Sequence, residues 1–284
     1  MIKEPYHPSL VASDLGGTLV PPGRERVPYE TLAVLDAIMN LGVPVALVTG
    51  FNLQTTRNML TGLNGTPWLL VQNGTTAVRD GKTIWELGLH PEHAEKLVKL
   101  LEALRVPVIV YRDLSRGGVP EYLASGSFRK GPPFRAVAEF RDFTGITGVS
   151  TRVTNNRVGE VKAALEHNLS IDSRLILSPG TSRTWIEITP AGARKDRALI
   201  RLCGELGIAV KRMIYFGDNL NDLEALRIAG LPRVVADARP ELRAEFPVTG
   251  SSAGQGPARE LAEIFGFRRR KDTGFSRQEK RKPC

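Results

Sequence analysis

Short apolar runs alternate with helical patterns through the first part of this chain. Residues 10–12, 43–48 and 68–71 are apolar and bounded by turn residues, which is typical of buried strands. One helical stretch between them begins at Pro28 and ends before Gly42. Strands that alternate with helices predict a mostly parallel, doubly wound sheet, whose ligands bind at the carboxyl ends of the strands.

Polar residues stand where three of the apolar runs end. Asp14 follows the first run, and the pair Thr49-Gly50 closes the second. Asp218 comes directly after the hydrophobic residues 213–217, and Lys195 precedes a predicted helix at 196–206. We therefore expect Asp14, Thr49, Lys195 and Asp218 to converge at one edge of the sheet.

The turn after Asp14 is rich in glycine. In Gly16-Gly17-Thr18 the backbone N–H groups can converge on an anion, because glycine adopts conformations that other residues avoid. A carboxylate beside such a turn is placed to act on a phosphate.

These motifs resemble those of a known family. The string D-L-G-G-T is similar to the first motif, D-x-D-G-T, of the haloacid dehalogenase superfamily. Further segments look like the Cof-type branch of that superfamily, namely V-T-G-F, V-Q-N-G-T, W-I-E-I-T-P-A-G-A-R-K and I-Y-F-G-D-N-L-N-D-L-E-A-L. The resemblance covers nearly the whole chain except its basic end. It implies a Rossmann-like α/β core with an inserted α+β cap domain that closes over the active site.

The resemblance also implies an activity and a set of roles. The activity is a Mg²⁺-dependent phosphatase that acts on small phosphorylated metabolites, commonly sugar phosphates, through an aspartyl-phosphate on Asp14. Asn221 and Asp222 would orient a metal-bound water or a substrate oxygen. The implied catalytic residues are Asp14, Thr49 and Lys195; the implied substrate-binding residues are Gly17, Thr18, Gly50 and Asn221; and the implied metal ligands are Asp14, Asp218 and the backbone carbonyl of Gly16.

Gly16 departs from the family pattern, because it stands where the second aspartate of D-x-D-G-T would act as general acid and base. That function is worth roughly 10²–10⁴-fold in rate. The first interpretation is therefore a slowed phosphatase, and the second a catalytically silent protein that binds a phosphorylated ligand. The third is a phosphonate-cleaving relative, which would need an imine-forming lysine among Lys82, Lys96, Lys99, Lys130 and Lys162.

The change of pattern near Gly81 predicts three parts. Residues 1–80 and 187–267 are expected to form the core domain, residues 81–186 the α+β cap domain, and residues 268–284 a basic tail without regular structure. A cap loop with Arg129, Lys130 and Arg135 would suit an anionic substrate.

Composition narrows the functional class. The net charge of +9 is concentrated in the tail, where eight Lys/Arg face two acidic residues, so a nucleic-acid partner is expected at most through that tail. Cys203 and Cys284 offer no disulfide framework, and His90 and His93 lack a third ligand. No apolar run is long enough to span a bilayer, and we expect a cytoplasmic protein without a membrane partner. The sequence carries no signal for oligomeric state.

Overall fold

The chain forms two compact units in a computed structural model that describes residues 7–114, 120–123, 135–270 and 274–277. The core unit comprises the described residues of 1–51, 56–82 and 195–284, and the inserted unit those of 52–55 and 83–194. Arg129 and Lys130 of the expected basic loop, and Cys284, lie outside the described residues.

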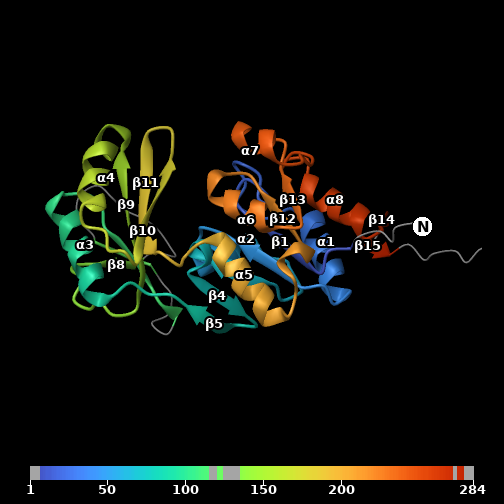
Figure 1. Cartoon of the computed structure of the whole chain (residues 1–284), viewed down its shortest axis with the longest axis horizontal. Helices are drawn as coiled ribbons and strands as arrows, with labels where there is room; N and C mark the ends of the chain where they lie inside the picture. The colour runs from blue at the N-terminus through green and yellow to red at the C-terminus, as the bar shows by residue number, and fades with distance from the viewer. Residues whose placement is uncertain (1–6, 115–119, 124–134, 271–273, 278–284) are drawn as a thin grey trace, which may run out of the picture. The chain divides into compact units, whose positions relative to one another are not determined.

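A seven-stranded sheet in the order β13-β12-β1-β2-β3-β4-β5 organises the core unit (Figure 1). Neighbouring strands from β13 to β3 run parallel, and β4 pairs antiparallel with β3. The predicted parallel α/β core is thus confirmed, and an antiparallel edge adjoins it. The strands are β1 (Leu10–Ser13), β2 (Val45–Val48), β3 (Trp68–Val71), β4 (Thr76–Arg79), β5 (Lys82–Glu86), β12 (Met213–Gly217) and β13 (Leu231–Val234).

Helices accompany this sheet, and α1 packs beside α8 while α5 packs beside α6. The central strand β1 is buried along its whole length, as expected for a parallel strand that is covered on both faces. The helices are α1 (Tyr29–Asn40), α2 (Leu53–Met59), α5 (Lys195–Leu206), α6 (Leu223–Ile228), α7 (Pro240–Glu245) and α8 (Gly256–Ile264), with 3-10 turns η1 (Gln72–Gly74), η4 (Val210–Arg212) and η5 (Leu220–Asp222).

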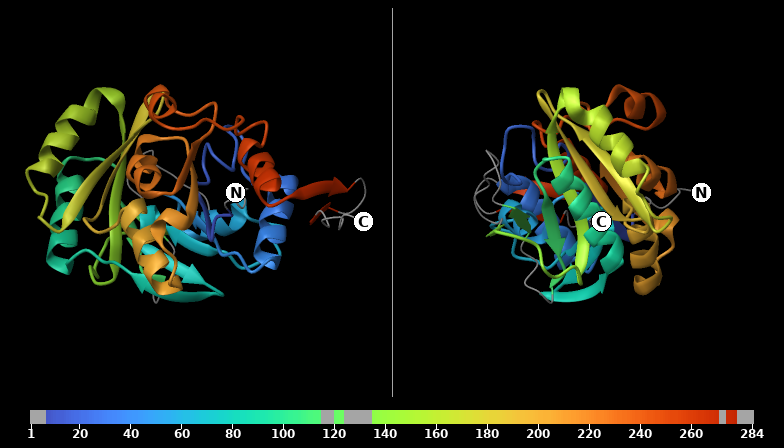
Figure 2. Two further views of the ribbon diagram at one scale, coloured as in Figure 1. Left: turned by 45° about the vertical axis from the view of Figure 1, so that its right-hand side comes forward. Right: turned by 90° about the vertical axis from the view of Figure 1, so that its left-hand side faces the viewer.

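The inserted unit contains a second, mostly antiparallel sheet in the order β10-β11-β9-β6-β7-β8. Helices α3 (Pro91–Ala103) and α4 (Val158–Glu166) lie on one face of it (Figure 2), where Leu97 and Val161 pack against Val149 and Ile186. The remaining elements are β6 (Ile109–Arg112), β7 (Glu121–Leu123), β8 (Arg135–Val137), β9 (Ile146–Thr154), η3 (Asn155–Arg157), β10 (Ser173–Pro179) and β11 (Arg183–Pro190).

The predicted boundary at residue 187 is wrong. Strand β11 was expected to lead back into the core domain, but it pairs with β10 on one side and β9 on the other. Because its backbone groups are satisfied by both neighbours, the strand belongs wholly to the inserted unit. The core unit resumes only at Lys195.

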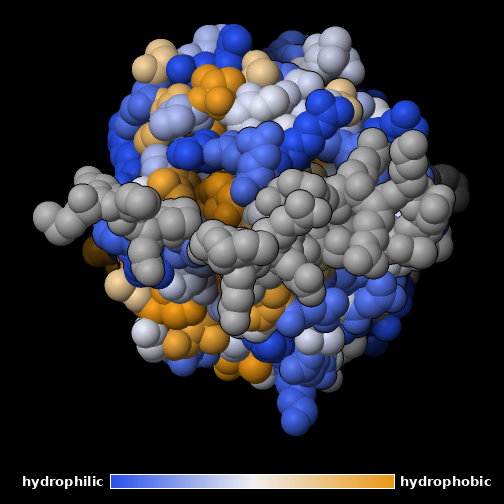
Figure 3. All heavy atoms as spheres, turned by 90° about the vertical axis from the view of Figure 1, so that its right-hand side faces the viewer, coloured by the Kyte–Doolittle hydropathy of each residue, from blue (hydrophilic) through white to orange (hydrophobic). Residues whose placement is uncertain are grey.

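The basic tail also differs from expectation. Strand β14 (Phe267–Arg270) pairs antiparallel with β15 (Gly274–Arg277), where the sequence predicted no regular structure. The two strands are close in sequence, so that bringing them together costs little chain entropy. The end of the core unit that carries α8 presents mainly hydrophilic side chains with smaller hydrophobic patches among them (Figure 3).

Within the part of the chain that the structure describes, every helix is too short or too polar to cross a bilayer.

Glu187 lies on β11 of the inserted unit, between the helix-facing residues Ile186 and Ile188. Burial raises the pKa of its carboxyl from the usual value of 4.5 to about 7. The folded state therefore retains a proton that the unfolded chain has lost between these two pH values. The contribution of Glu187 therefore leaves the free energy of unfolding at its highest below pH 4.5, and this free energy falls as the pH rises toward 7.

Glu187→Gln removes this titration. We expect the variant to melt at a higher temperature than the wild type at about pH 8, and the difference to shrink at about pH 5. Thermal unfolding at both pH values measures the effect, with the exposed Glu102→Gln on α3 as the matched control. A difference between Glu187→Gln and wild type that is the same at both pH values would show that folding does not raise the pKa of Glu187.

Candidate active site

Three neighbouring parallel strands of the core unit end in the predicted site residues. Ser13 of β1 is in register with Leu47 of β2 and with Phe216 of β12. The N–H of Asp14 donates to the carbonyl of Phe216 at 2.9 Å, which fixes the backbone where β1 ends. Asp14, Thr49 and Asp218 therefore follow adjacent strands at the carboxyl edge of the sheet, as the sequence predicted.

Lys195 joins two of the loops at this edge. It is the first residue of α5, is 3% exposed, and donates from Nζ to Asp14 Oδ1 and to Asp222 Oδ1, each at 2.7 Å. Burial by itself lowers the pKa of the ammonium, but the charges of Asp14 and Asp222 outweigh it and raise that pKa. Lys195 is thus held in its charged form.

The hydrogen bonds of Asp222 differ from the role expected for it. It is fully buried, and its Oδ1 also accepts from the Tyr215 hydroxyl at 2.6 Å. Its Oδ2 accepts from the N–H groups of Asp218 and Asn219, both at 3.1 Å. Because both oxygens are engaged inside the protein, Asp222 holds Lys195 and the 218–222 loop, and the expectation that it orients a water or substrate oxygen is corrected.

Tyr215 is a residue that the sequence analysis missed. It lies in the middle of β12 and is fully buried, and burial, followed by the charge of Asp222, raises the pKa of its hydroxyl. The signal was a tyrosine inside an otherwise apolar strand, because a buried tyrosine hydroxyl needs a hydrogen-bond partner.

Gly17 and Thr18 make hydrogen bonds within the turn that follows Asp14 and with Asp218. The N–H of Gly17 donates to Val20 and the N–H of Thr18 to Leu15, so both are used within the turn. The Thr18 hydroxyl donates to Asp218 Oδ1 at 2.8 Å. The Thr18 hydroxyl therefore supports Asp218, and the role of Gly17 and Thr18 in binding substrate stays a prediction.

Gly17 must be glycine for two reasons. Its φ of +85° lies in the left-handed region that side chains rarely adopt. In addition, a Cβ at this position would collide with the Asp218 carboxylate. The second glycine of the turn therefore makes room for an acidic side chain.

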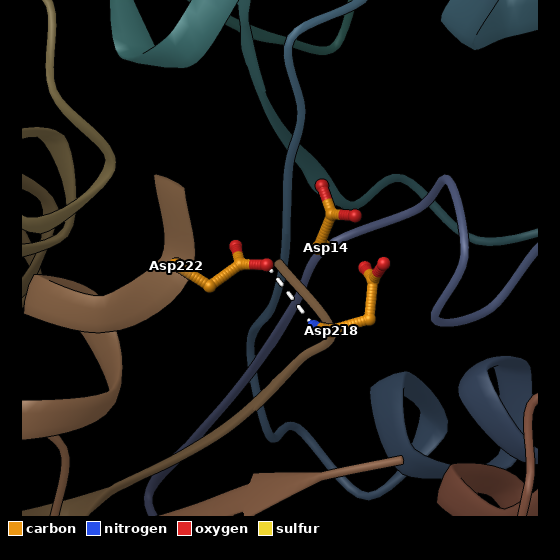
Figure 4. A group of neighbouring side chains, drawn as sticks. All are labelled: Asp14, Asp218 and Asp222. Atoms are coloured by element: carbon orange, nitrogen blue, oxygen red, sulfur yellow. Dashed lines mark hydrogen bonds between the residues drawn. The ribbon is translucent and has the colours of Figure 1, made fainter. Parts of the chain in front are cut away.

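Three carboxylates gather where these loops meet. Among the described residues, one oxygen each of Asp14, Asp218 and Asp222 lie within 4.8 Å of one another. Asp14 and Asp218 extend in the same direction, and Asp222 approaches from the side and accepts from the Asp218 N–H (Figure 4).

The charges in this cluster do not balance. Burial, with the charge of Asp222 adding to it, raises the pKa of Asp218 to about 6. Burial also raises the pKa of Asp14 well above its usual range, and the repulsion from Asp222 and Asp218 adds to this against the opposing charge of Lys195. Three buried or partly buried carboxylates thus face one ammonium. A hard divalent cation with oxygen ligands fits this donor set.

Asn73 is a second residue of the site that the sequence analysis missed. Its N–H donates to the carbonyl of Thr49 at 2.7 Å, and its Oδ1 accepts from Asn221 Nδ2 at 3.3 Å. A Cβ on Gly50 would lie 3.5 Å from the Asn73 amide. Asn73 therefore links the Thr49-Gly50 turn to the loop of Asp218. Its signal was the Asn-Gly pair after β3, where Asn73 has a positive φ of 57°.

The backbone of Gly16 lies beside the side chain of Phe51. Its φ lies outside the left-handed region, and its Cα faces the ring of Phe51. The predicted use of its carbonyl as a metal ligand stays a prediction.

Comparisons with known proteins identify the family of this chain. A family model for haloacid dehalogenase-like hydrolases matches residues 11–256. The HMP-PP phosphatase of Citrobacter koseri is 25% identical over 252 residues, which cover 84% of this chain and 88% of that protein. The HMP-PP phosphatase of Yersinia pseudotuberculosis is 27% identical over 263 residues, which cover 89% and 93%.

The fold has close structural neighbours. A crystal structure of a haloacid dehalogenase-like hydrolase from Bacteroides thetaiotaomicron matches with a TM-score of 0.76 at 18% identity, over 90% of this chain and 99% of that one. The family resemblance that the strand-end motifs suggested is thus confirmed, and the chain belongs to the haloacid dehalogenase-like hydrolases.

Proposed function

We propose that this protein is a phosphatase that hydrolyses a small phosphorylated metabolite in two steps, through an aspartyl-phosphate on Asp14. The observation that carries the proposal is the ion pair that holds the buried Asp14 carboxylate against Lys195 at the end of the central strand. The relatives that are named HMP-PP phosphatases support phosphate-ester or anhydride chemistry.

Asp14 is the nucleophile in this proposal. One oxygen is held by Lys195, which leaves the second oxygen to attack phosphorus. Lys195 offsets the negative charge of the nucleophile and of the incoming phosphoryl group. Asp222 acts through Lys195, because its hydrogen bond fixes the ammonium beside Asp14.

Thr49, Gly50 and Asn221 are proposed to hold the phosphoryl oxygens. The Thr49 hydroxyl accepts from the Phe51 N–H at 3.2 Å, and a hydroxyl that accepts one bond can still donate its own proton. Asn221 is exposed and is held on one side by Asn73. These groups are placed by backbone turns, so that they orient the phosphate at little entropic cost.

A divalent cation, which we propose to be Mg²⁺, would be held by Asp14, Asp218 and the carbonyl of Gly16. When bound, such an ion neutralises the phosphate and polarises it toward attack. Asp222 belongs to the same acidic cluster, but its two oxygens already accept four hydrogen bonds. We therefore assign Asp222 to Lys195 rather than to the ion.

The first test is turnover. Wild-type protein incubated with Mg²⁺ and a panel of phosphate esters and anhydrides should release inorganic phosphate. Asp14→Asn keeps the shape of the side chain but removes the nucleophile, so phosphate release should fall to background, a loss on the order of 10⁶-fold for a fast enzyme. Activity that survives in Asp14→Asn would reject the covalent mechanism. A folded wild type that binds phosphorylated compounds without turnover would instead favour the silent binding protein, which the missing acid at Gly16 also allows.

The second test concerns the metal. A ligand that binds only the native state stabilises it by mass action. At 100 times its dissociation constant, Mg²⁺ should raise the free energy of unfolding by about 2.7 kcal/mol, and the melting temperature should rise with it. Asp218→Asn should lose most of this response, and without Mg²⁺ it should be more stable than the wild type because one buried charge is gone.

Asp80→Asn is the matched control for the metal test, since Asp80 is an exposed residue of the same unit. It should keep the full Mg²⁺ response. The metal assignment fails if Asp218→Asn and Asp80→Asn respond alike.

A further inference from the structure

An aromatic ring lies where a side chain of residue 16 would be. A Cβ built on Gly16 would stand 2.9 Å from Phe51 Cε2 and 3.2 Å from Phe51 Cζ. The backbone of Gly16 does not need glycine, because its φ lies outside the left-handed region, in contrast to Gly17. The atoms that a side chain at residue 16 would meet first belong to the edge of the Phe51 ring, so the ring must shift to admit one.

The backbone of Phe51 is fixed while its side chain is partly free. Its N–H donates to Thr49 Oγ1 at 3.2 Å, and its carbonyl accepts from the Gln72 N–H at 2.9 Å. The residue is 39% exposed. Phe51 thus presents one ring edge to the turn after Asp14, and part of the residue is open to solvent.

This arrangement has a chemical consequence at the leaving group. A carboxyl at residue 16 would give a proton to the leaving oxygen, whereas a phenyl ring has no proton to give. Among the described carboxyl groups near Asp14, Asp222 cannot replace it, because both of its oxygens accept hydrogen bonds inside the protein. Asp218 accepts from the Thr18 hydroxyl and is the carboxylate proposed above to hold the cation. The leaving oxygen must therefore depart without a proton from a residue at this position.

We propose that the Gly16–Phe51 pair restricts this site to phosphates whose leaving oxygen is stable as an anion, namely acyl phosphates, phosphoanhydrides and aryl phosphates. Phe51 is the specificity-determining residue of the pair, since its ring packs against the leaving group in place of an acid. The proposal rests on the phosphatase function proposed above and names the substrate class of the same site.

The two steps balance without an acid at residue 16. In the first, an Asp14 oxygen forms a bond to phosphorus, the bond from phosphorus to the leaving oxygen breaks, and that oxygen keeps the electron pair. In the second, a water oxygen attacks phosphorus, the bond to Asp14 breaks and restores the carboxylate, one water proton passes to solvent, and the other stays on the product phosphate. The leaving group is a carboxylate from an acyl phosphate, a phosphate from an anhydride, or a phenolate from an aryl ester.

The experiment compares four proteins: wild type, Gly16→Asp, Phe51→Ala and the double variant Gly16→Asp/Phe51→Ala. Each is given acetyl phosphate, nitrophenyl phosphate and glycerol phosphate with Mg²⁺, and kcat/KM is measured for each substrate. In the wild type, glycerol phosphate should react at least about 10²-fold more slowly than acetyl phosphate, which corresponds to the missing acid. The double variant should raise kcat/KM for glycerol phosphate relative to acetyl phosphate by about 10²–10⁴-fold. Gly16→Asp alone should give less, because the ring obstructs the new carboxyl.

A matched control is Gly16→Asn/Phe51→Ala, which fills the same space with an amide that cannot act as the acid. It should leave the ratio of the two substrates as in Phe51→Ala. Thermal unfolding of every variant shows that each is folded, and Phe51→Leu replaces Phe51→Ala if the smaller side chain unfolds the protein.

Two results would overturn the proposal while the phosphatase function stands. One is a wild type that hydrolyses glycerol phosphate as fast as acetyl phosphate. The other is a Gly16→Asp variant that equals the double variant, which would show that Phe51 does not restrict residue 16. If folded wild type turns over none of the three substrates, the proposed function itself fails, and the substrate class fails with it.

Discussion

The ammonium of Lys195 between Asp14 and Asp222 is the interaction on which the site depends. It connects the loop after β1, the start of α5 and the loop after β12, which are far apart in sequence. All three side chains are nearly inaccessible to water. Removal of one partner from a buried ion pair typically costs about 3–5 kcal/mol, because a charge is left unpaired. This ion pair therefore holds the strand ends in place and also positions the proposed nucleophile.

The same cluster carries more negative charge than Lys195 can offset. Burial and repulsion from neighbouring carboxylates raise the pKa values of both Asp14 and Asp218. Folded proteins keep an arrangement that lowers their stability where a binding site requires it. Here a cation would relieve the repulsion, and the site would then accept an anionic phosphoryl group. The role proposed for Asp218 in holding a cation is thus opposed to its effect on stability without one.

Much of the fold could be predicted from sequence, because alternating strands and helices leave a local pattern. The same holds for Asp14, Thr49 and Asp218, since each directly follows an apolar strand. The boundary at 187 was missed because a strand such as β11 carries no mark of the sheet that it joins. A strand is assigned to a unit only by its partners.

The relations between side chains were harder to predict. Neither the hydrogen bond of Tyr215 to Asp222 nor the ring of Phe51 over Gly16 follows from spacing, because each depends on how loops meet in space. The sequence marked Gly16 as unusual, but only the structure identifies the ring that a side chain at this position would meet.

Trapping the covalent intermediate on Asp14 is the most direct test of the proposed mechanism. Wild-type protein is mixed with acetyl phosphate and Mg²⁺, quenched in acid, digested, and analysed by mass spectrometry of its peptides. We expect one phosphoryl group on the peptide that contains Asp14, which hydroxylamine removes as it does from an acyl phosphate, and none on the Asp14→Asn protein. Phosphate on a different residue, or steady turnover with the Asp14 peptide never modified, would contradict it.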